Sequence, residues 1–176
     1  SHLFGFFSVF NPDVIKDVIL YKGGSPARFG GRLSSVLDIY QKEGNSKDFN
    51  VTGGIGLVSS RLLIEGPIKK EKSSFLIGGR SSYAHLFLPL FDNDNKAYFY
   101  DLNSKINYRF NDSNNVFLST YFGKDVFGIS DNFVNNYGNT VVNLRWNHLF
   151  TDKLFSNLSL IYSDYFYGLI LDFVGF

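Results

Sequence analysis

The sequence lacks cysteine entirely, has only four prolines and almost no net charge, and contains no long apolar run. Without cysteine the chain can form neither a disulfide framework nor a thiolate metal site. Because no apolar stretch is long enough to cross a bilayer as a helix, a transmembrane helix is excluded. A net charge of +1 argues against a nucleic acid as a partner.

A methionine start and a signal peptide are also missing at Ser1. We therefore expect the 176 residues to be a piece of a longer protein. The sequence is rich in Phe, Tyr and Gly, with 20, 11 and 17 residues respectively. This composition is more typical of strands that face lipid than of an average globular core.

Seven stretches alternate apolar and polar residues at period two, most clearly 97–110. One face of that stretch carries Tyr98, Tyr100, Leu102, Ile106, Tyr108 and Phe110, and the other carries Asp101, Asn103, Lys105, Asn107 and Arg109. Such a strand separates an apolar environment from water, and tyrosines at both strand ends indicate a membrane-interface girdle. Trp146 near the end of a second such stretch, 139–150, fits the same girdle; core packing in a soluble sheet is the alternative.

The succession of strands and connectors predicts an all-β fold. Two short strands, 15–21 and 35–40, flank a connector whose four glycines permit tight turns. Seven further strands are predicted at 49–57, 60–66, 73–83, 97–110, 115–125, 139–150 and 154–167. Connectors 67–72, 111–115 and 151–153 are short, whereas 84–96 and 126–138 are long and rich in Asn, Asp and aromatics. Short turns at one end and long loops at the other are typical of an outer-membrane barrel.

Residues 15–42 read I-K-D-V-I-L-Y-K-G-G-S-P-A-R-F-G-G-R-L-S-S-V-L-D-I-Y-Q-K. This segment resembles the end of the plug domain of TonB-dependent outer-membrane receptors. The matching positions are Tyr21, Gly23, Pro26, Ala27, Phe29, Gly30, Gly31, Val36, Ile39 and Lys42. The runs R-L-L-I-E-G-P-I, S-S-F-L-I-G-G-R-S-S-Y and Y-F-Y-D-L-N-S-K-I-N-Y-R-F resemble the opening barrel strands of the same family. The sequence R-L-S-S-V-L-D-I differs from the corresponding run of the siderophore receptors and resembles more the nutrient-importing, SusC-like branch.

The resemblance implies that residues 1–45 are the C-terminal part of a plug and that residues 46–176 are the first strands of a transmembrane β-barrel. Barrels of this family have about 22 strands. The chain would then be a fragment of a plugged transmembrane antiparallel β-barrel with about seven strands visible, since an open sheet edge is forbidden in lipid. Other strands would have to complete it.

The function that the resemblance implies is active uptake of a scarce nutrient, such as a siderophore, glycan or peptide, across a Gram-negative outer membrane. The implied partners are outer-membrane lipid, the TonB energising complex and the nutrient, and the family also allows a surface lipoprotein. Two alternatives stay open. A passive channel or structural outer-membrane protein would share the strands without needing the plug motif. A soluble glycan-binding β-sandwich would also explain alternation and aromatics.

Neither catalysis nor a cofactor is expected, because His2, His85 and His148 are scattered and no nucleophile-base arrangement can be placed. The run Asp92-Asn93-Asp94-Asn95 lacks the glycine and terminal glutamate of a calcium loop, so we predict a polar loop tip and no metal site. Ligand contacts are expected in the two long loops and beside them, from His85, Phe87, Phe91, Tyr98, Phe127, Phe133 and Tyr137. For His85 a solvated position in the loop is the favoured alternative to ligand contact.

Alternation also predicts which charges point inward. Arg61, Glu65, Arg80, Asp101, Lys105 and Arg109 fall on the polar side of their strands, and the glycine-rich turn adds Arg28 and Arg32. These side chains are either a solvated wall or a set of contacts that hold the plug. Because family members dock plug arginines on barrel glutamates, the resemblance implies that Arg28 or Arg32 pairs with Glu65.

Overall fold

The computed structural model describes residues 8, 10–24, 26, 29–30, 35–83, 86, 95–129 and 133–171. Over these residues the protein is all-β, apart from 3-10 turns such as η2 (Pro12–Val14). The strands are β1 (Ile15–Tyr21), β2 (Val36–Gln41), β3 (Asn50–Ile55), β4 (Ser59–Lys69), β5 (Ser73–Ser82), β6 (Lys96–Asn111), β7 (Asn114–Ile129), β8 (Phe133–Thr151) and β9 (Leu154–Leu171). Within the described ranges, no helix has the length and apolarity that crossing a membrane requires.

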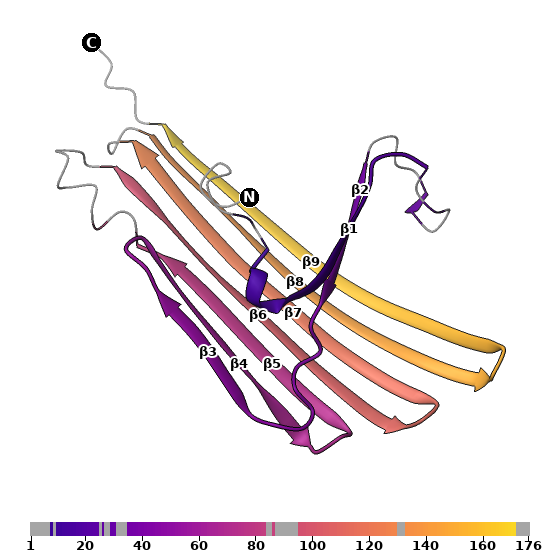
Figure 1. Ribbon diagram of the computed structural model, residues 1–176. Coiled ribbons are helices and arrows are strands. Elements are labelled where there is room, and N and C mark those ends of the chain that lie inside the picture. Colours follow the sequence, from indigo (N-terminus) through magenta and orange to yellow (C-terminus); the bar gives the residue numbers. More distant parts are fainter. Residues whose placement is uncertain are drawn as a thin grey trace, which may run out of the picture.

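The strands form two separate antiparallel sheets. β1 pairs only with β2, whereas β3 to β9 form a seven-stranded sheet in which each strand pairs with the next in sequence. Figure 1 shows β3 and β9 at the two edges, so the sheet is not closed on itself. The predicted all-β, seven-stranded antiparallel arrangement is confirmed, because alternation and turn spacing favour pairing between sequence neighbours.

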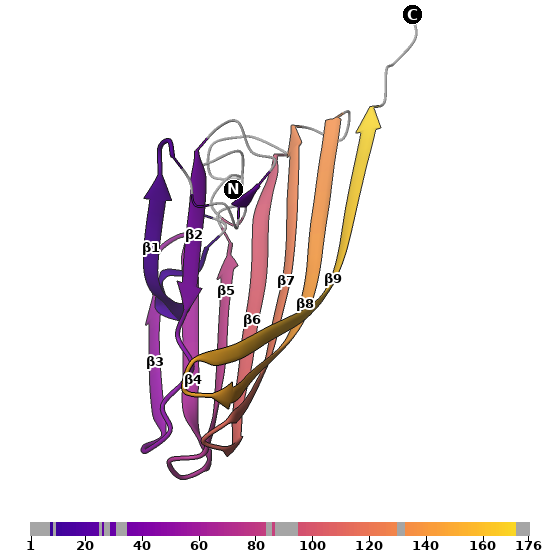
Figure 2. The same ribbon diagram turned by 90° about the vertical axis from the view of Figure 1, so that its right-hand side faces the viewer.

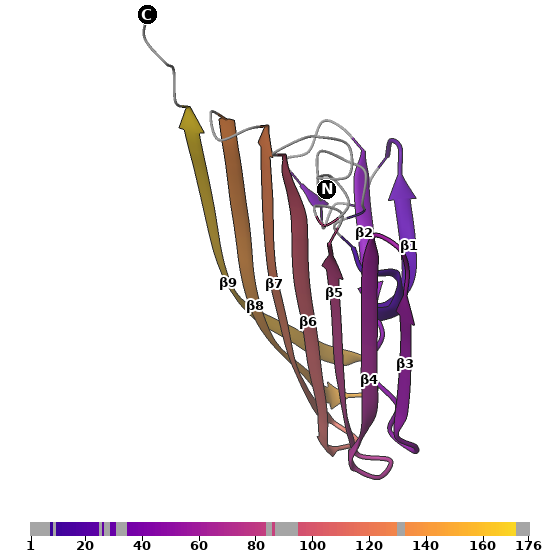
Figure 3. The same ribbon diagram turned by 90° about the vertical axis from the view of Figure 1, so that its left-hand side faces the viewer.

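The seven-stranded sheet is strongly curved. Figures 2 and 3 show its two edges bending toward the side on which the β1–β2 hairpin lies, so the hairpin sits on the concave face. The chain reaches β3 through Gly44, whose φ of 86° favours glycine. A Cβ on Gly44 would lie 2.5 Å from the carbonyl oxygen of Phe75, so this close passage from hairpin to sheet needs a residue without a side chain.

Connections at one end of the sheet are short, as predicted: residues 70–72, 112–113 and 152–153 join β4–β5, β6–β7 and β8–β9. At the other end, residues 83–95 form a long connection between β5 and β6, also as predicted. The predicted long loop at 126–138 is wrong, because only residues 130–132 separate β7 from β8. Its content of Asn, Asp and aromatic residues suggested a loop, but cross-strand pairing such as Val126 with Asn136 continues the ladder through this segment.

The two faces of the sheet differ as the alternation predicts. On β6, Tyr100, Leu102 and Ile106 point to the convex face with 38%, 47% and 41% of their surface exposed. Asp101 and Lys105 point to the concave face and are only 3% and 6% exposed. The apolar face is therefore open, and the N-terminal segment covers the polar face around Asp101 and Lys105, whereas concave residues of β9 such as Ser163 are exposed. This burial argues against a solvated position for Asp101 and Lys105, whereas Arg61 and Arg109 of the same predicted set are exposed.

Candidate functional site on the concave face

The N-terminal segment docks on the concave face through a capped turn. Asn11 accepts a hydrogen bond from the Asp13 N–H through its side-chain oxygen at 3.0 Å, and Pro12 occupies the first position of η2. The turn projects Val14 onto the sheet, where it packs with Leu63 and Leu76; all three are at most 4% exposed. These apolar contacts hold the N-terminal segment against the sheet, next to the polar contacts described below.

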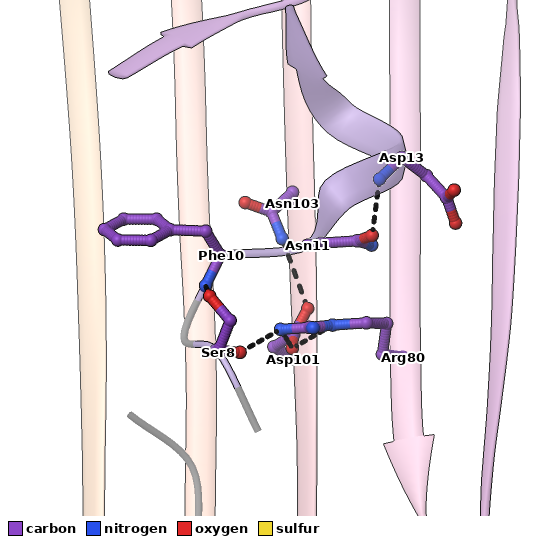
Figure 4. Close-up of polar contacts among 7 residues, drawn as sticks. All are labelled: Ser8, Phe10, Asn11, Asp13, Arg80, Asp101 and Asn103. Carbon is purple, nitrogen blue, oxygen red and sulfur yellow. Dashed lines mark hydrogen bonds and ion pairs between the residues drawn. The ribbon is translucent and has the colours of Figure 1, made fainter. Parts of the chain in front are cut away.

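A chain of polar contacts links strands β5 and β6 to the N-terminal segment (Figure 4). Arg80 Nε donates to Asp101 Oδ2 at 2.8 Å, and Arg80 Nη2 donates to the carbonyl oxygen of Ser8 at 3.0 Å. Asn103 donates to the second carboxylate oxygen of Asp101 at 3.2 Å. The Asp101 side chain is fully buried, so it needs this combination of a cation and a neutral donor. The guanidinium thereby links the sheet to the N-terminal segment.

A second link involves an ion pair between η2 and β4. Arg61 Nη1 lies 3.2 Å from Asp13 Oδ1, with half of the arginine side chain exposed. Because of that exposure the pair contributes at most about 1 kcal/mol. The segment after β2 adds contacts through Glu43. Its carbonyl oxygen accepts from Ser74 Oγ at 2.8 Å, and its carboxylate accepts from Asn107 at 3.3 Å.

Between the hairpin and strands β6–β8 lies a cavity of about 430 Å³. Its lining is mixed: cationic Lys16, Lys105 and Arg145, acidic Asp38 and Glu43, hydroxyl and amide groups, and aromatic rings including Phe117 and Tyr121. A space of this size falls within the range of ligand pockets. It was not predicted from the sequence, because its two walls are 60 or more residues apart in places, such as Gln41 and Lys105.

The predicted pairing of Glu65 stays a prediction. Glu65 lies on the concave face of β4, half-buried, opposite Asn50 of β3 and Leu76 of β5. Its proposed partners Arg28 and Arg32 lie outside the described residues, as do His85, Phe87 and Phe91 of the predicted ligand loop and Asp92, Asn93 and Asp94 of the acidic run.

The remaining predicted ligand contacts lie on strands rather than in loops. Phe127 is in β7, and Phe133 and Tyr137 are in β8, all on the concave face near the end opposite the short turns. Tyr137 pairs with Asp125 of β7 and its hydroxyl hydrogen-bonds the carboxylate. Tyr98 is in β6 on the convex face, so it lies on the opposite side of the sheet from the other three, and ligand contact stays a prediction for all four. The strands are longer than expected, and this extension moves these positions out of the loops.

Sequence reasoning missed the residues that attach the N-terminal segment. Asn11, Asp13 and Glu43 were not singled out, although Asn-Pro-Asp is a recognisable start of a helical turn. The observed ion pair also has the opposite polarity to the predicted one: the acid is on the N-terminal segment and the arginine, Arg61, is on the sheet. Over the part of the chain that the structure describes, no three His, Asp or Glu side chains gather as a metal site.

Comparison with protein-family models, with curated proteins and with solved structures gave no match for this chain.

Proposed function

We propose that this chain is the end of the plug and the first barrel strands of a TonB-dependent transporter that imports a scarce nutrient across a Gram-negative outer membrane. The observation that carries the proposal is the contrast between the two faces of one sheet. Its convex face is apolar and exposed, and its concave face is polar and covered in part by the N-terminal hairpin. The resemblance of residues 15–42 to a plug terminus accounts for that hairpin.

The convex face supports a lipid environment. Soluble monomers rarely expose large contiguous apolar patches. Here exposed apolar side chains continue from strand to strand through cross-strand neighbours, for example Ile106 with Leu118, Leu118 with Leu144, and Leu144 with Leu160. Ser104 and Thr120 are polar residues on this face, and their hydroxyl groups form a hydrogen bond of 2.7 Å with each other. In hydrocarbon an unpaired hydroxyl would be costly, so this pairing favours the same environment.

Aromatic residues bracket the apolar band. On β6, Tyr100 packs on Phe122 and Tyr108 packs on Phe110, with ring centroids 6.0 and 4.7 Å apart. The eight residue steps from Tyr100 to Tyr108 correspond to about 26 Å along a strand, or about 20 Å along the membrane normal at a usual tilt. Near the short turns, Trp146 donates to the side-chain oxygen of Asn114 at 3.2 Å. An indole with an apolar body and a satisfied N–H suits a membrane interface.

Strand length supports the same reading. β6 to β9 have 16, 16, 19 and 18 residues, more than the roughly 9–11 that cross a bilayer. The excess would extend beyond the membrane on the side of the longer connection. On the convex face, Lys124 and Asp164 lie in that half of their strands, whereas His148 lies near the short turns.

The proposal is tested on the full-length protein in its native host. We expect the protein to migrate differently on gels with and without heating, and to support growth on a scarce nutrient only when the inner-membrane TonB system is intact. A panel of iron chelates, glycans and peptides as sole sources identifies the nutrient. Uptake that persists without TonB identifies a passive channel instead. A protein found outside the membrane fraction, without a heat shift, contradicts the membrane proposal altogether.

A further inference from the structure

The cavity between the hairpin and strands β6–β8 carries an excess of positive charge. Lys16 comes from β1, Lys105 from β6 and Arg145 from β8. Over the described residues, none of these three cations has a carboxylate within ion-pair distance. Lys105 makes one long hydrogen bond, 3.3 Å, to the carbonyl oxygen of Gln41. Glu43 attracts Lys105, but only from beyond ion-pair distance. Three cations face two carboxylates in the cavity, so an additional anion would be favoured there.

Two of these cations share one aromatic ring. The guanidinium carbon of Arg145 lies 4.4 Å from the centroid of Phe117, and Lys105 Nζ lies 5.5 Å from the same centroid. Phe117 is only 4% exposed, so solvent screens the two charges poorly. The ring offsets part of their repulsion through its negative face, but it carries no charge. An anion between the two cations would remove that repulsion.

The acids of the cavity have other partners. Asp38 Oδ2 accepts from the Tyr40 hydroxyl at 2.9 Å, and Glu43 accepts from Asn107. The Nε donor of Arg145 is buried and has no hydrogen-bond partner in the described protein. A buried donor on a charged group is costly to leave unpaired, and the guanidinium fork matches a carboxylate.

We propose that this cavity binds the carboxylate of a small organic anion, with Arg145 and Lys105 as its ligands. Apolar walls from Phe10, Tyr121 and Val141 would take the body of the molecule. The inference goes beyond transport, since binding requires only the hairpin seated on β6–β8. It therefore stands or fails independently of the TonB dependence proposed above.

The test measures binding of benzoate to the purified full-length protein in detergent micelles by ligand-observed NMR and calorimetry. We expect benzoate to bind, and added salt to weaken its binding because the attraction is electrostatic. Benzyl alcohol, which has the same ring without the charge, should bind far more weakly. Arg145→Gln should raise the benzoate Kd about tenfold or more, and Arg145→Lys should fall between, because it keeps the charge but loses the fork.

Arg109→Gln is the matched control. Arg109 lies on the same face of β6 but near the short turn and outside the cavity, so its replacement removes the same charge and should leave the Kd unchanged. Thermal melts confirm that each variant is folded. The proposal is overturned if benzoate does not bind the unmodified protein, if benzyl alcohol binds as tightly, or if both glutamine variants weaken binding equally. Binding of inorganic phosphate without benzoate would also overturn it, by assigning a different anion.

Discussion

Leu160→Arg is the substitution that most directly tests whether the convex face contacts lipid. Leu160 lies near the middle of β9, is 62% exposed and stands opposite Leu144 on that face. An arginine at the bilayer midplane of a β-barrel destabilises it by about 2–4 kcal/mol. On a water-exposed surface the same change would stay within about 0.5 kcal/mol. The difference between these values is large enough to measure.

Ser163→Arg on the same strand is the matched control. Ser163 is exposed and stands opposite Val141, on the concave face. An arginine at this position would point into an aqueous interior, so we expect the free energy of unfolding to fall by less than about 1 kcal/mol. Both substitutions introduce the same side chain at nearly the same height on the strand. They differ in the face to which the side chain points.

The assay is guanidinium unfolding of the full-length protein in dilauroylphosphatidylcholine vesicles, followed by tryptophan fluorescence. We expect the unfolding free energy to fall only for Leu160→Arg. Equal losses for both variants, or none for either, would refute the assignment of the convex face to lipid. A larger loss for Ser163→Arg would show that the two faces have been assigned the wrong way round.

Two further substitutions test how the N-terminal segment is held. Gly78→Ala should weaken the docking of the N-terminal segment, because a Cβ at this position would lie 2.5 Å from a methyl of Val14, and hydrogen exchange around η2 should therefore rise. Gly79→Ala is the control: its Cβ would have its nearest neighbours 3.7 Å away, so hydrogen exchange around η2 should not change. Asp101→Asn should lower the free energy of unfolding by about 3–5 kcal/mol, since it leaves the guanidinium of Arg80 buried without its counter-charge. If the unfolding free energy measured by heat or denaturant barely changes, the Arg80–Asp101 pair is unimportant for stability.

The sequence by itself determined the number of long strands, their order and the residues on each face. Period-two alternation assigns Leu102 and Asp101 to opposite faces whatever the rest of the chain does, because successive side chains in a strand point in opposite directions. The short turns are equally local, since a few polar residues between alternating segments can only reverse the chain. The strand Ile15–Tyr21 was also predicted with its observed bounds.

Only the tertiary structure decided where the strands end and which polar groups meet. The segment 126–138 looks like a loop by composition, yet pairing with a neighbouring strand outweighs the low propensity of its asparagines. Contacts such as Arg61 with Asp13, Lys105 with Gln41, and Arg145 with Phe117 join positions 28 to 64 residues apart. Alternation gives the face of a side chain but not what covers that face. The burial of the polar side and the charged cavity beneath the hairpin therefore follow from how the hairpin packs on the curved sheet.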